Sequence, residues 1–194
     1  MKILRITSLL AAVALAFTFN TALAGEECEN QNIIDLGGGA HGTTNLCINS
    51  KGLKAQFNVK GLTAGDAYTV WWVYFDDPSL CTGGGAGVCG DPDFGPSEAG
   101  GGTPLAVFGR FGSAVAPRNG KVHMTSDWGG MQPSSGAEVW LLMLGHGPAN
   151  HSDGRHLARQ LLTPEDPLAG IPHLGNEVDG TGFIPTALTI YIVD

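Results

Sequence analysis

Ala-Tyr-Thr-Val-Trp-Trp-Val-Tyr-Phe, residues 67–75, is the stretch of this chain that decides its fold. It combines β-branched and aromatic residues without a charge and is too short for an independent helix, which is typical of a strand. Alternation places Tyr68, Val70, Trp72 and Tyr74 on one face and Thr69, Trp71, Val73 and Phe75 on the other. Because neither face is polar, we expect this strand in the middle of a sheet, with a second sheet on one side and a loop, helix or partner on the other.

Residues 53–60 precede this stretch and alternate apolar with polar side chains, as a half-exposed strand does. We expect residues 61–66 to turn the chain back, so that 53–60 and 67–75 form a hairpin. Further upstream, residues 33–36 and 45–48 are expected to be short strands, separated by three consecutive glycines.

A second hairpin is expected downstream. Residues 105–116 and 121–126 flank Pro-Arg-Asn-Gly, and Asn-Gly between two strand-like runs is the strongest short-range hairpin signal. Residues 138–144 are expected to form another fully buried strand, and residues 186–193 the last strand.

Long irregular connections separate these strands, and the chain contains thirty glycines and eleven prolines. A short helix is expected to end at Leu162, capped by Ser152 or Asp153 and stopped before Pro164. The sequence therefore predicts an all-β fold, an antiparallel β-sandwich with long Gly-rich loops and at most one short helix. An open β-barrel is the alternative architecture.

Residues 1–24 have the organisation of a signal peptide. Lys2 and Arg5 precede an apolar run over residues 6–19, and Ala22-Leu23-Ala24 has the pattern of a cleavage site. We therefore expect cleavage after Ala24, a secreted or periplasmic protein, and a single domain over residues 25–194.

The net charge of the expected mature chain argues against polyanionic partners. Eight basic residues face eighteen acidic ones, a net charge of −10, and no stretch clusters Lys and Arg. Proteins that neutralise phosphates need the opposite balance, so nucleic acid and anionic membrane surfaces are not expected partners. After the signal peptide, no apolar run approaches the length of a transmembrane helix.

Four cysteines remain in an oxidising compartment, and their even number predicts disulfides. Three pairings are possible. We favour Cys28–Cys47 with Cys81–Cys89, because each bridge then closes a local loop. A zinc or redox site is the alternative, but no Cys-x-x-Cys spacing supports it.

Histidines recur at intervals of five in a polar loop, and His173 follows further on. His146, His151 and His156, with Asp153 among them, would suit Zn or Cu(II) if the loop folds back on itself. Helical spacing would not bring them together, since five residues rotate a helix by about 140°. Ordinary surface histidines are the alternative interpretation.

The long loop over residues 76–103 is acidic and contains no basic residue. Asp76, Asp77, Asp91 and Asp93 could gather around Ca²⁺, which prefers carboxylate oxygens. A solvated acidic loop that keeps an exported protein soluble is the alternative, and no cofactor is required by the sequence.

Trp128 follows a strand end, where an exposed indole could stack on a sugar, so it is a candidate carbohydrate-binding residue. Asp127 and Glu138 could also form the carboxylate pair that glycoside hydrolysis needs. Trp71, Trp72 and Trp140 are expected in the core. The sequence has no phosphate-binding glycine motif and no Gly-x-Ser-x-Gly elbow, so it points to no catalytic residue.

Several short strings together resemble a group of uncharacterised secreted bacterial β-rich proteins. They are the strand over residues 68–75, the Asp-Pro loop with two cysteines and Cys89-Gly90, Gly136-Ala137-Glu138-Val139 and His146-Gly147-Pro148. The resemblance spans about residues 61–148. It implies a secreted β domain and carries no catalytic residue.

Together these features favour a disulfide-stabilised, non-enzymatic binding or structural module whose ligand is unknown. The alternatives are a metal-binding protein or metal-dependent enzyme that uses the loop over residues 146–156, and a carbohydrate-binding module.

Overall fold

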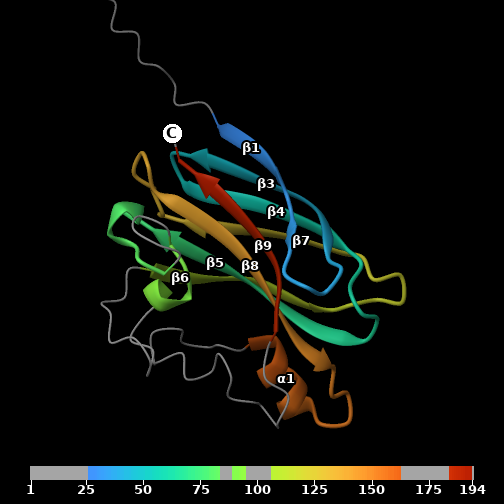
Figure 1. The fold of residues 1–194 in the computed structure, drawn as a ribbon. Coiled ribbons are helices and arrows are strands. Elements are labelled where there is room, and N and C mark those ends of the chain that lie inside the picture. The colour runs from blue at the N-terminus through green and yellow to red at the C-terminus, as the bar shows by residue number, and fades with distance from the viewer. Residues whose placement is uncertain (1–25, 84–88, 95–105, 163–183, 194) are drawn as a thin grey trace, which may run out of the picture.

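Two antiparallel sheets pack face to face in the computed structural model, which describes residues 26–83, 89–94, 106–162 and 184–193 (Figure 1). The four-stranded sheet has the order β1 (Glu27–Asn32), β3 (His41–Asn49), β4 (Gly52–Lys60), β7 (Val122–Gly129). The five-stranded sheet has the order β2 (Ile34–Asp35), β9 (Ile184–Ile192), β8 (Glu138–Pro148), β5 (Asp66–Phe75), β6 (Ala106–Val115). The sheets stay separate, so the predicted sandwich is confirmed over the alternative barrel.

β5 lies between β8 and β6, and all its residues after Asp66 are buried, as the sequence predicts. Its face with Val70 and Trp72 packs into the core between the two sheets, against apolar residues of β4 such as Phe57. Its other face, with Trp71 and Phe75, belongs to a second apolar cluster. β5 therefore joins two cores, one on each side of its sheet.

The second cluster is covered by the loop that follows β5. This loop contains two short 3₁₀ helices, η1 (Pro78–Leu80) and η2 (Asp91–Phe94), and the Cys81–Cys89 disulfide. The Phe94 ring lies 6.0 Å from that of Phe75 and 5.8 Å from that of Trp140, measured between centroids. A disulfide-closed loop thus provides the layer expected over the outer side of β5.

Both predicted hairpins are wrong, because β4 and β5, like β6 and β7, belong to different sheets. At both connections the chain crosses from one sheet to the other. The two connections are hydrogen-bonded to each other at one end of the sandwich. Leu62 N–H donates to the carbonyl of Gly120 (3.2 Å), and Gly65 N–H to that of Ala116 (2.8 Å). Leu62 and Ala116 are both buried, so the crossings close the core between the sheets.

The Asn-Gly signal still marks a tight turn. Gly120 has a φ of +62°, which favours glycine, and its N–H donates to the carbonyl of Pro117 at 2.8 Å. The sequence therefore predicted the tight turn correctly but not the pairing of the flanking strands.

The predicted helix is present as α1 (Gly154–Leu162), at one end of the sandwich (Figure 1). The Asp153 carboxylate accepts a hydrogen bond from Arg155 N–H at 2.9 Å, so the expected cap is confirmed. Buried Gln160 attaches the helix to the end of β8, because its amide donates to the carbonyl of Pro148 and accepts from Asn150 N–H, both at 2.9 Å.

Both favoured disulfide pairings are present. Cys28 on β1 lies directly opposite Cys47 on β3, with a Cα–Cα distance of 4.0 Å, and Cys81 pairs with Cys89. Within the described ranges, no helix is long and apolar enough to cross a membrane. The expected signal peptide over residues 1–24 lies outside the described residues.

Candidate binding face

His146, the first of the predicted metal ligands, is buried near the end of β8. Its Nε2 lies 2.9 Å from the hydroxyl of Thr69, which accepts a hydrogen bond from the indole N–H of Trp71 at 3.0 Å. Burial of the imidazole lowers the pKa of His146 to about 4, so the ring is neutral at physiological pH. This histidine joins β5 to β8 through Thr69.

His151 and Asp153 are exposed in the turn before α1, whereas His146 is buried. In the part of the chain that the structure describes, the ligand atoms of these three residues do not gather within 4.8 Å of one another. The side chain of His156 and all of His173 lie outside the described residues. The Zn or Cu site therefore stays a prediction from the sequence.

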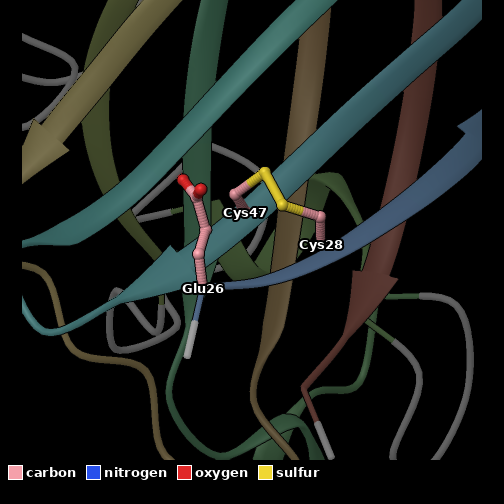
Figure 2. A group of neighbouring side chains, drawn as sticks. All are labelled: Glu26, Cys28 and Cys47. Carbon is pink, nitrogen blue, oxygen red and sulfur yellow. A yellow bond between two sulfur atoms is a disulfide. The ribbon is translucent and has the colours of Figure 1, made fainter. Parts of the chain in front are cut away.

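One group of potential metal ligands does lie together, namely Glu26, Cys28 and Cys47 (Figure 2). Its two sulfurs are bonded to each other, and a disulfide lacks the thiolate that metals bind. In Figure 2 the Glu26 carboxylate lies beside the disulfide, at the end of the four-stranded sheet. The group is thus a cross-link between β1 and β3 with an exposed carboxylate next to it.

The described members of the predicted calcium set each bind a separate local donor. Asp76 accepts from the Tyr74 hydroxyl, and this bond lowers the pKa of the carboxyl. Asp77 accepts from Ser79 N–H and caps η1. The side chain of Asp91 lies outside the described residues.

Asp93 is the one buried carboxylate among the described residues of this loop, and its hydrogen bonds hold the loop together. It accepts hydrogen bonds from the backbone N–H groups of Thr82, Gly83 and Gly90 at 2.8–3.0 Å. Burial by itself raises the pKa of Asp93, but these donors hold it below its ordinary value. The carboxylate thereby ties together the two ends of the loop that the Cys81–Cys89 disulfide closes.

Trp128 is half-buried and packs on the core, with its ring 5.9 Å from that of Trp72. A Cβ on Gly109 would lie 3.0 Å from the indole, so this glycine on β6 leaves room for it. Asp127 and Glu138 belong to different sheets, and Glu138 accepts from the indole N–H of Trp140 at 2.8 Å. Trp71, Trp72 and Trp140 are buried as predicted.

The four-stranded sheet carries a second candidate site, which the sequence prediction missed. Strand register brings eight hydrogen-bonding side chains without formal charge at neutral pH to its solvent side, and we call them the polar face. They form two rows across the four strands, Asn30–Asn45–Gln56–Thr125 and Asn32–Thr43–Asn58–His123. All are exposed except Asn45, which is half-buried.

Neighbouring side chains of the polar face bind each other across the strands. The Asn45 amide donates to Oδ1 of Asn30 at 3.1 Å. Nδ1 of His123 lies 2.5 Å from Oδ1 of Asn58, which can only accept, so His123 donates. These bonds orient the amides, and among the described residues no partner binds Nδ2 of Asn58 or Nε2 of His123, so both can bind a ligand.

One end of the polar face is hollowed into a groove of about 430 Å³. Thr43, Asn58 and His123 line it together with Lys60 and Lys121, and we call it the lysine groove. Lys60 ends β4 and Lys121 immediately precedes β7, so both ammonium groups lie at the same end of the sheet.

The alternation of residues 53–60 correctly predicts that Lys54, Gln56, Asn58 and Lys60 face solvent. It does not reveal the neighbours of β4, because β7 follows more than sixty residues later in the chain. The polar face exists only because the strand register aligns polar residues from four strands.

No family model, curated protein or solved structure matches this chain. The resemblance to secreted bacterial β-rich proteins accordingly stays a prediction.

Proposed function

We propose that this protein is an exported, non-enzymatic binding module whose polar face binds carbohydrate. The observation that carries the proposal is the polar face itself, in which four adjacent strands present eight side chains that hydrogen-bond without a formal charge at neutral pH.

The chemistry of these side chains matches that of sugar hydroxyls. An amide offers two donors and an acceptor oxygen, and a threonine hydroxyl both donates and accepts, as each sugar hydroxyl does. Binding such a ligand desolvates neutral groups and replaces their bonds to water, which costs far less than burying unpaired charges.

A protein partner fits this surface less well. Protein interfaces depend on a few buried aromatic or large apolar anchors. The eight residues of the polar face include no Trp, Tyr, Phe, Leu, Ile or Met. Side chains that can hydrogen-bond to sugar hydroxyls therefore dominate the surface.

The sheet also holds these side chains in fixed positions. β3 and β4 lie inside the sheet, and the Cys28–Cys47 disulfide fastens the edge strand β1 to β3. Side chains held on rigid strands lose less conformational entropy on binding than side chains on loops.

The two disulfides fit an oxidising compartment, and the pattern of residues 1–24 favours export. Export would place the polar face among the polysaccharides outside the cell.

The proposal is tested by screening the mature protein against a panel of oligosaccharides and measuring affinity for the best one by calorimetry. In the double variant Gln56→Ala/Thr125→Ala, which empties the middle of the polar face, we expect affinity to fall at least tenfold. The control is Thr63→Ala/Ser135→Ala, two exposed residues outside the face. Unchanged affinity in the first variant, or no binding anywhere in the panel, would show that the face is not a carbohydrate site.

A further inference from the structure

We infer that the lysine groove receives an anionic substituent, so that the ligand of the polar face is an acidic polysaccharide bearing carboxylate or sulfate groups. This inference rests on the proposed function and specifies the class of sugar.

The charges on the solvent side of the four-stranded sheet are separated along its strands. At one end lie the ammonium groups of Lys60 and Lys121, which both line the lysine groove. The described carboxylates of this side, Glu26 and Asp127, lie towards the opposite end. Lys60 lies six positions after Lys54, which faces Asp127, and this is roughly 20 Å along an extended strand.

The two ends consequently differ in their net charge. Lys54 has the Asp127 carboxylate directly across the strand pair. No described carboxylate lines the lysine groove, where Lys60 follows Val59 and Lys121 precedes Val122, the cross-strand partner of Val59. Like charges placed side by side on a sheet destabilise it, and an anion bound between them would remove that repulsion.

Neutral donors complete the groove. The His123 bond fixes Oδ1 of Asn58 as an acceptor, which leaves the amide Nδ2 to donate, and the hydroxyl of Thr43 lies on the next strand. Carboxylate and sulfate oxygens only accept, and bonds to them from charged donors are shorter and stronger than neutral ones. The groove thus offers several donors to one anionic group.

The rest of the chain limits which anions can bind. A mature net charge of −10 repels densely charged polymers such as nucleic acid, which carries one charge per roughly 1.7 Å of duplex. A polysaccharide with widely spaced carboxylates or sulfates can place one of them in the groove while its hydroxyls cover the polar face.

The test uses three probes with the mature protein: an oligogalacturonate, the same oligomer with its carboxylates methyl-esterified, and a sulfated galactan oligomer. The variant is Lys60→Gln/Lys121→Gln. The control is Lys51→Gln/Arg155→Gln, which changes the net charge equally at two exposed residues outside the groove.

We expect the wild type and the control to bind at least one acidic probe at least tenfold more tightly than the esterified one at low salt. The groove variant should lose this preference and its salt dependence yet still bind the esterified probe. A preference for the carboxylated or the sulfated probe shows which of the two substituents the groove binds more tightly. Equal binding of acidic and esterified probes by the wild type would overturn the inference alone, whereas binding of none would overturn the proposed function with it.

Discussion

The Nε2 atom of His146 lies 2.9 Å from the Thr69 hydroxyl oxygen, and both residues are buried. The same Thr69 hydroxyl accepts from the indole N–H of Trp71, so it links the two side chains. Burial keeps the imidazole neutral within the apolar layer on the outside of the five-stranded sheet.

Protonation of this histidine should make the fold sensitive to mild acid. Because the folded-state pKa is lowered from 6.5 to about 4, the unfolded chain binds more protons between these values. The stability that neutral His146 provides is complete above pH 6.5 and is lost as the pH falls towards 4, by roughly 3 kcal/mol in all. The folded-state pKa is measured directly by NMR titration of the imidazole.

Urea unfolding between pH 6.5 and 4.0 should show this loss in the wild type and in His151→Gln, whose site is exposed, but not in His146→Gln. Asp76 and Asp93, whose pKa values are lowered below 3.8, lose their contribution only at more acidic pH. An imidazole that titrates near pH 6.5 would show that His146 is not buried as described.

Trp72 should be one of the most sensitive positions of the core. It is 1% exposed and packs 5.0 Å from the ring of Phe111, measured between centroids. Trp72→Ala should lower the free energy of unfolding by about 3–5 kcal/mol, measured in urea. Trp128→Ala, at a half-buried position, should lower the free energy of unfolding clearly less. An unchanged melting temperature in Trp72→Ala would refute the central place of β5.

Asp93→Asn should loosen one loop and leave the sheets intact. The amide cannot accept all three backbone N–H groups now bound, and each donor left buried without a partner costs about 1–3 kcal/mol. Hydrogen exchange at Thr82, Gly83 and Gly90 should accelerate, while that of β5 and β8 should not. Asp77→Asn, at an exposed cap, is the control, and equal acceleration throughout the sandwich would contradict a local role.

Gly42 is expected to be intolerant of any side chain. Its φ is +151°, and a Cβ there would lie 2.0 Å from the backbone oxygen of Asn58, so Gly42→Ala must displace β3 from β4. We expect a loss above 1 kcal/mol in the free energy of unfolding, together with weaker ligand binding in the adjacent groove. Gly129→Ala, where a Cβ meets nothing within 4 Å, should stay within about 0.5 kcal/mol of wild type.

The sequence predicted what depends on local pattern. The apolar faces of residues 67–75 identified a central strand, the alternation of 53–60 identified its buried and exposed sides, and Asp153 identified the start of the helix. Each of these depends on residues that are neighbours in the chain.

The sequence did not predict which distant strands pair with each other. Tight turns after β4 and β6 looked like hairpins, since nothing local shows that buried Leu62 and Ala116 guide the chain from one sheet to the other. The polar face was missed for the same reason, because Gln56 and Thr125 become neighbours only through the β4–β7 register.

The most direct test of the account is NMR mapping of the ligand on the protein. An acidic oligosaccharide titrated into isotope-labelled mature protein should shift the amide signals of Thr43, Asn58 and His123 and the side-chain amide of Gln56. Signals of β8 and β9 in the opposite sheet should stay in place. Shifts confined to the five-stranded sheet or to the loop over residues 146–156 would contradict the claim that the polar face is the binding site.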